Sequence, residues 1–162
     1  MSWGRPRKWM ALAAVAFGVN LLWELAQSPL YAGAADLPMR VYLRAGAVDA
    51  LLVTGAAAVA TLLGRRSRVA FWMVFVGTLL ASAVFIEVRA VTGGRWSYSA
   101  LMPTIGVVGI SPLVQLPLTG ALSMALVSRL RPCLERRGRR HGVSRASGEA
   151  REPGGSSSGR AQ

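Results

Sequence analysis

The sequence predicts an all-α membrane protein, a bundle of four transmembrane helices followed by a disordered basic C-terminal tail. Hydrophobic residues make up 52% of the 162 residues, yet the formal net charge is +12. The charges gather between long apolar segments and at the C-terminal end, whereas soluble domains spread them along the chain. Each apolar segment is also long enough to cross the hydrocarbon core of a bilayer.

The expected spans are residues 9–27, 45–63, 69–87 and 105–130. The first span ends at Ser28-Pro29, because proline cannot continue the hydrogen-bond ladder of a helix. A cleaved signal peptide would begin in a similar way, but its apolar core would be shorter and would lack polar residues. We therefore expect the first segment to remain as a span.

The later spans have distinct features. Small residues such as Gly55 and Ala58 in the second span let helices approach closely in lipid, so we expect a homo-oligomer. Pro112 and Pro117 fall inside the fourth span. We expect either a kink at Ser111-Pro112 or a short re-entrant start before a straighter helix.

Residues 132–162 form the predicted tail, in which Arg, Gly, Ser and Glu dominate. This composition cannot pack a core, so the sequence predicts disorder there. A run of arginines, residues 136–140 with one interruption, follows the last span closely. We expect this cluster to meet anionic lipid head groups and not nucleic acid.

The arginines also predict the orientation. Four spans place the N-terminus, the loop at 64–68 and the tail on one side, which carries most of the cations. The other side carries only Arg40, Arg44, Arg89 and Arg95. The positive-inside rule puts both termini in the cytoplasm. A composition rich in Arg, Ala and Gly is typical of a GC-rich bacterial genome, so the expected location is a bacterial inner membrane.

Polar residues of all four spans converge towards the outer side in this topology: Glu24, Asp49, Glu87 and Gln115. A charge at the middle of a membrane costs about 2.5–3.5 kcal/mol. We therefore expect these carboxylates to face the bundle and to pair with arginines, of which Arg44 and Arg89 lie nearest in depth.

This cluster has two main interpretations. Such pairs can fix the register of the helices, as in a structural or partner-binding protein. Alternatively the cluster is a site, in which Glu24 or Glu87 acts as a buried acid. A transport pathway is a third interpretation, which requires an oligomer. The residues expected to contribute to a binding site are Asn20, Trp23, Gln27, Asp49, Arg89, Arg95, Trp96, Tyr98 and Gln115.

Several kinds of chemistry are excluded. Cys133 is the only cysteine and His141, in the tail, is the only histidine. These counts rule out an intramolecular disulfide and a cysteine- or histidine-rich metal site. Phosphate-binding loops and haem-attachment motifs are also missing. We expect no metal ion and no cofactor.

The stretch from Glu87 to Gln115 resembles the lycopene-cyclase-type membrane domain of carotenoid biosynthesis. That family has a helix ending in an acid, a G-x-W-x-[YF] loop and a proline-containing helix start, matched here by Glu87, residues 94–98 and residues 110–113. The resemblance implies an isoprenoid ligand and acid catalysis. The family has paired glutamates after its proline, whereas Val114-Gln115 stand here, so Glu24 or Glu87 would supply the acid.

The whole chain also resembles small bacterial four-helix membrane proteins with W-E-x-x-Q-x-P-L-Y in the first helix and W-x-Y-x-x-x-M-P before the last. Here these motifs are residues 23–31 and 96–103. This resemblance concerns the kind of protein and not its activity. We expect a non-catalytic membrane protein that is structural or binds a lipid or a partner. The alternative is an intramembrane enzyme that acts on an isoprenoid.

Overall fold

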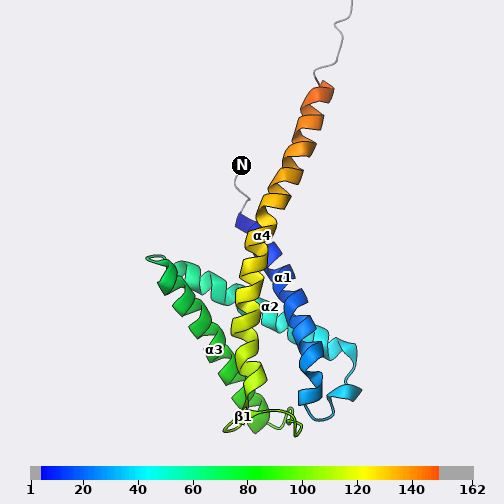
Figure 1. Ribbon diagram of the computed structural model, residues 1–162, viewed down its shortest axis with the longest axis vertical. Coiled ribbons are helices and arrows are strands. Elements are labelled where there is room, and N and C mark those ends of the chain that lie inside the picture. Colours follow the sequence, from blue (N-terminus) through cyan, green and yellow to red (C-terminus); the bar gives the residue numbers. More distant parts are fainter. Residues whose placement is uncertain (1–4, 150–162) are drawn as a thin grey trace, which may run out of the picture. The chain divides into compact units, whose positions relative to one another are not determined.

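The computed structural model describes the backbone of residues 5–149 and the side chains of residues 6–34 and 36–130 (Figure 1). The chain divides after Ser128 into two units, and the first unit holds every side chain considered below. Its helices are α1 (Arg5–Gln27), α2 (Met39–Leu63), α3 (Arg68–Thr92) and the first part of α4 (Ile110–Glu149). Short 3-10 turns, η1 (Ser28–Leu30) and η2 (Ala34–Asp36), connect α1 to α2.

Four segments of these helices are long and apolar enough to span a membrane: Pro6–Leu30, Met39–Leu63, Arg68–Thr92 and Ile110–Leu130. This confirms the predicted four-helix class. The helices extend beyond the predicted spans, since α1 begins at Arg5, α2 begins at Met39 and α3 continues to Thr92. Asp49 and Glu87 both lie inside helices, as the spans predicted.

The fourth segment begins differently from the prediction. A β-hairpin pairs β1 (Thr104–Ile105) with β2 (Val108–Gly109), where a helix was expected from residue 105. Gly106, with φ +61°, takes the first position of the two-residue turn, a conformation that glycine adopts without strain. Pro112 falls in the first turn of α4, where a helix needs no backbone donor, so this proline starts the helix and does not kink it.

Helix α4 continues to Glu149, past the end of the predicted membrane domain at residue 131. The tail predicted to be disordered comprises residues 132–162, and its residues 150–162 fall outside the described residues. The side chains of the arginine cluster at 136–140 also lie outside them, so its contact with lipid head groups stays a prediction.

Small residues let the helices of the first unit pack closely. Gly46 of α2 faces α1, and a Cβ atom there would lie 3.2 Å from the Leu21 nitrogen. Gly120 of α4 faces α3, and a Cβ atom there would lie 2.7 Å from Leu79 Cδ1. Gly55, expected at a packing face, points away from the bundle with no atom within 4 Å. Homo-oligomerisation through that face stays a prediction.

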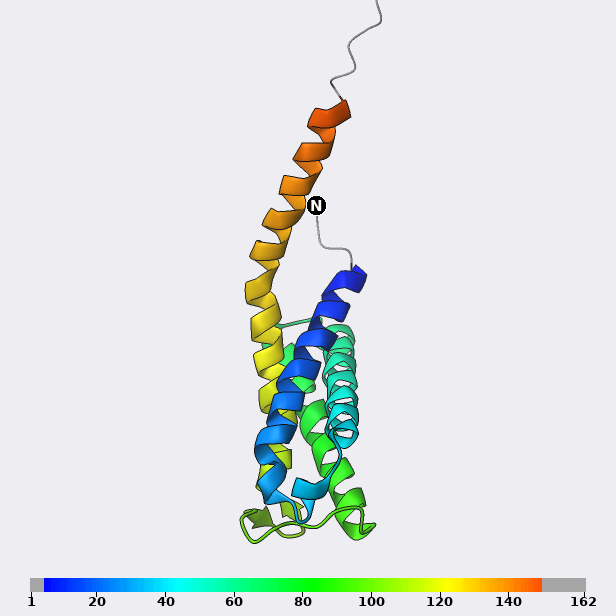
Figure 2. The ribbon, with the colours of Figure 1, turned by 90° about the vertical axis from the view of Figure 1, so that its right-hand side faces the viewer.

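The outer surface of the bundle is apolar, as helices in lipid require. Large side chains there are mostly accessible, with Leu51 and Met73 each 71% exposed and Phe85 66% exposed. The loops that follow α1 and α3 gather with the hairpin at one end of the first unit (Figures 1 and 2). We call this end, at which α1 and α3 finish, the cavity end.

Substituting Gly64 by alanine should destabilise the turn between α2 and α3. A Cβ atom at Gly64 would lie 2.6 Å from the Phe71 nitrogen and 2.7 Å from the Ala60 oxygen, and neither backbone atom can move freely. We expect a loss of about 1–3 kcal/mol in the free energy of unfolding, measured by thermal unfolding in mild detergent. Gly55→Ala is the matched control and should stabilise α2 slightly. A Gly64→Ala protein as stable as Gly55→Ala would contradict the close turn.

Candidate functional site

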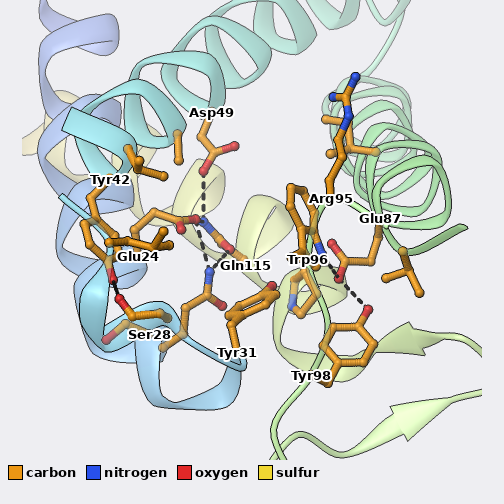
Figure 3. A pocket seen from close by; sticks show the side chains of 18 of the residues that line it. Glu24, Ser28, Tyr31, Tyr42, Asp49, Glu87, Arg95, Trp96, Tyr98 and Gln115 are labelled. Atoms are coloured by element: carbon orange, nitrogen blue, oxygen red, sulfur yellow. Dashed lines mark hydrogen bonds between the residues drawn. The ribbon is translucent and has the colours of Figure 1, made fainter. Parts of the chain in front are cut away.

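A cavity of about 1230 Å³ lies at the cavity end, between α1, α2, α3 and the start of α4 (Figure 3). Much of its wall is apolar, formed by Ala45, Val48, Ala83, Ile86 and Leu116. Its polar side chains form two groups, one around Gln115 and one around Glu87, and Tyr31 lies between them in Figure 3. Exposed residues such as Leu37, Val41 and Arg44 also line the cavity, so it opens at the surface beside α2.

The first group centres on the Gln115 side chain, which is 4% exposed. Its amide nitrogen donates to Glu24 Oε1 at 2.6 Å and to Asp49 Oδ2 at 2.9 Å. The Gln27 nitrogen donates to Glu24 Oε1 at 3.1 Å and to the Gln115 oxygen at 2.8 Å. One buried amide thus ties together carboxylates from α1 and α2 and an amide from α1.

Trp23 determines the direction of this network. An indole N–H can only donate, and that of Trp23 lies 3.1 Å from Gln27 Oε1. The Ser111 hydroxyl donates to the same oxygen at 2.7 Å. The Gln27 nitrogen must therefore point at Glu24 and at the Gln115 oxygen, which in turn aims the Gln115 nitrogen at the carboxylates. Every amide N–H of the group donates to an acceptor.

The second group centres on Glu87 of α3, which is 2% exposed. Its Oε1 accepts a hydrogen bond from the Trp96 indole at 3.2 Å and another from the Tyr98 hydroxyl. The backbone N–H of Gly109 donates to that same hydroxyl at 2.7 Å. Since Gly109 supplies the proton of its own hydrogen bond, the Tyr98 proton points at Glu87. The hairpin therefore holds Tyr98, and Tyr98 and Trp96 hold the carboxylate.

The two loops at the cavity end pair with each other. A β-bridge joins Tyr31 to Tyr98, with hydrogen bonds of 2.9 Å from Ala32 N to Ser97 O and from Ser99 N to Leu30 O. The Tyr31 ring packs against Trp96, with ring centroids 6.2 Å apart, and against Tyr98, at 5.8 Å. The segment after α1 is thereby fastened to the segment that holds Glu87.

Both bridging tyrosines remain neutral at physiological pH. Burial, followed by the nearby Glu87 and Glu24 carboxylates, raises the pKa of Tyr31 above its ordinary value. Burial first, and then the hydrogen bond to Glu87, raises the pKa of Tyr98 to about 12. The two phenols therefore keep their protons, and Tyr98 donates its proton to the Glu87 carboxylate.

Arginines do not contribute to these contacts, contrary to the expectation of ion pairs. The hydrogen-bond partners of these carboxyl groups among the described residues are amides, an indole and a phenol, and Glu24 and Asp49 also hydrogen-bond to each other. Arg44 and Arg95 are exposed at the rim of the cavity, and Arg89 is exposed on α3 outside it. Neutral donors satisfy the carboxylates without burying a guanidinium group.

The structure brings most of the predicted site residues together. Those that line the cavity are Glu24, Gln27, Asp49, Glu87, Arg95, Trp96, Tyr98 and Gln115. Trp23 and Arg89 do not line the cavity, and Trp23 instead donates a hydrogen bond to Gln27. Asn20 is fully buried between α1 and α4, where it donates to Ala16 O at 2.9 Å and accepts from Thr119 at 2.8 Å. Its role is therefore in helix packing.

The sequence interpretation missed three residues of the site. Tyr31 and Tyr42 line the cavity, and Ser111 holds Gln27 from the first turn of α4. Tyr31 closes the motif at residues 23–31, which was a signal for it. Tyr42 and Ser111 carry no such signal, because a single hydroxyl in an apolar helix usually bonds to its own backbone.

Neither a protein-family model, a curated protein nor a solved structure matches this chain. Within the described residues, no group of three or more His, Cys, Asp or Glu side chains is placed to hold a metal ion.

Proposed function

We propose that this is a multi-pass protein of a bacterial inner membrane that binds an amphipathic lipid in the cavity. One observation carries the proposal, namely a cavity of about 1230 Å³ whose wall combines apolar helix faces with hydrogen-bonded carboxylates, of which Glu87 is buried and Glu24 and Asp49 are partly buried. An apolar chain fits the first kind of surface and a polar end fits the second. Protein interiors are close-packed and contain few large voids, so a cavity of this size favours a ligand over a purely structural network.

The proposed orientation places both termini in the cytoplasm and the cavity at the outer leaflet. The exposed Arg65, Arg66 and Arg68 at the opposite end of α2 and α3 support this, since cytoplasmic loops carry an excess of arginine and lysine. A lipid of the outer leaflet could then enter beside the exposed residues of α2.

Acid catalysis on an isoprenoid is the second candidate function. It is favoured by Glu87, since Trp96 and Tyr98 both occupy Oε1 and hold the carboxyl group in one orientation. A general acid must be positioned in this way against the atom that it protonates. The second carboxyl oxygen would then carry the proton that is transferred, in line with the family resemblance.

Mass spectrometry of what co-purifies with the protein from its own membranes tests both candidates. Wild-type protein should retain one specific amphipathic lipid, and Glu87→Gln should retain it at a level roughly tenfold lower if the carboxylate binds. Asp36→Asn is the control, because Asp36 is an exposed carboxylate outside the cavity wall, and it should behave as wild type.

The outcome also separates binding from catalysis. A Glu87→Gln protein that holds a different, unconverted lipid would indicate an enzyme. Bulk phospholipid alone, in equal amounts in all three proteins, would contradict lipid binding in the cavity.

A further inference from the structure

Most hydrogen-bond donors of the described cavity wall have protein acceptors. The donors of Gln27, Gln115, Trp96 and Tyr98 all point at protein acceptors. Tyr42 donates to Ala34 O at 2.6 Å and is also engaged. Away from the exposed rim, the Tyr31 hydroxyl is the one donor group of the described wall without a protein partner.

One acceptor, in contrast, remains free. Glu87 uses only Oε1 in hydrogen bonds with described residues, whereas Glu24 and Asp49 are also hydrogen-bonded to each other. Among the described side chains, no nitrogen or oxygen atom is both completely buried and without a partner. The second oxygen of Glu87 must therefore border open space, and Glu87 lines the cavity.

Tyr31 and Glu87 belong to one packed group. The Tyr31 ring contacts Trp96 and Tyr98, the same two side chains that donate to Glu87 (Figure 3). A free donor and a free acceptor oxygen thus stand on one side of the cavity. The other two carboxylates lie on the opposite side of Tyr31, around Gln115.

We infer that the polar end of the lipid is a hydroxyl group, which donates to the free oxygen of Glu87 and accepts from the Tyr31 hydroxyl. This inference rests on the proposed function and names its ligand class, a long-chain alcohol. A phosphate or carboxylate end would face three carboxyl groups. An ether or ketone has no proton to donate, and an ammonium has no lone pair to accept from Tyr31.

Photoaffinity labelling in lipid nanodiscs tests the class. The probe is a long-chain alcohol that carries a diazirine in its chain, and labelled peptides are located by mass spectrometry. Unlabelled hexadecanol, its methyl ether, hexadecylamine and hexadecyl phosphate compete with it. Hexadecanol should protect the cavity wall from labelling at concentrations about tenfold lower than the other three competitors. Each of those competitors loses one of the two hydrogen bonds or brings a negative charge close to the carboxylates.

Two tyrosine variants test the contact itself. Tyr31→Phe should raise the hexadecanol concentration that protects the cavity wall from labelling roughly fivefold. Tyr42→Phe is the matched control, because Tyr42 lines the same cavity with its hydroxyl already bonded, and it should stay within about twofold of wild type. Equal effects of the two variants would overturn the inference.

The competitors separate this inference from the proposed function. Equal protection by hexadecanol and its methyl ether, or better protection by the amine or the phosphate, would overturn the hydroxyl class while lipid binding stood. A cavity wall that no probe labels in wild-type protein would contradict lipid binding itself.

Discussion

Gln115→Leu is expected to lower the free energy of unfolding by about 3 kcal/mol or more, the largest effect that we predict for a single side chain. The leucine leaves Glu24 and Asp49 without the amide that donates to both of them, and Gln27 without its acceptor. Hydrogen bonds to charged groups contribute about 1.5–3 kcal/mol each, and a buried group that loses its partner also bears its cost of desolvation. Thermal unfolding in mild detergent measures the change.

The control for Gln115 is its neighbour Val114, which is exposed on the same turn of α4. Val114→Leu should leave the melting temperature nearly unchanged. Adding Glu24→Gln and Asp49→Asn to Gln115→Leu should recover part of the lost stability, because the cost comes from carboxylates without donors. A Gln115→Leu protein that melts like wild type would show that this amide does not hold the two carboxylates in the membrane.

Tyr98→Phe is expected to lower the free energy of unfolding by about 1–3 kcal/mol. The hydroxyl accepts from the Gly109 N–H and donates to Glu87, so its removal leaves a backbone donor without its acceptor and a buried carboxylate with one donor fewer. The hairpin should also loosen, because this hydroxyl ties β2 to α3. Thermal unfolding gives the stability, and amide hydrogen exchange at residues 104–109 gives the mobility of the hairpin.

Tyr31→Phe is the matched control for Tyr98, since Tyr31 lies on the same β-bridge and its hydroxyl has no described protein partner. Without added ligand it should change stability by less than about 0.5 kcal/mol. Equal losses in the two variants would mean that the two hydrogen bonds of the Tyr98 hydroxyl contribute no more to stability than the unbonded hydroxyl of Tyr31. The path from Gly109 through Tyr98 to Glu87 would then not be a structural connection.

The sequence alone predicts the helices of this protein well, since length and hydropathy decide where a chain can cross a membrane. The sequence also predicts that four polar residues come together, namely Glu24, Asp49, Glu87 and Gln115. Consecutive spans run in opposite directions, which brings the end of one span and the start of the next to the same side. Both predictions depend on simple geometry along a helix and not on the details of packing.

The partners of the carboxylates could not be predicted in this way. Charge balance suggests arginines such as Arg44 and Arg89, but a guanidinium group would have to lose its own hydration to reach a buried carboxylate. Gln115, Trp96 and Tyr98 reach the carboxylates at lower cost. Which of these side chains points inward depends on helix rotation, and a sequence pattern does not specify that rotation.

The hairpin was missed for a related reason. Residues 104–109 are mostly apolar and continue directly into an apolar helix, so their composition does not mark a boundary. Gly106 is the turn signal, yet a single glycine in an apolar segment is also common within membrane helices. The hydrogen bond from Gly109 to the Tyr98 hydroxyl depends on the hairpin. The sequence alone therefore could not predict that Tyr98 donates to Glu87.

Crystallography of the protein extracted from its own membranes without delipidation would test lipid binding in the cavity. We expect elongated density in the cavity, with its polar end within hydrogen-bonding distance of the Tyr31 hydroxyl and the free oxygen of Glu87. A cavity closed by contact between α2 and α3, with the carboxylates paired to Arg44 and Arg95, would show that the cluster has a purely structural role.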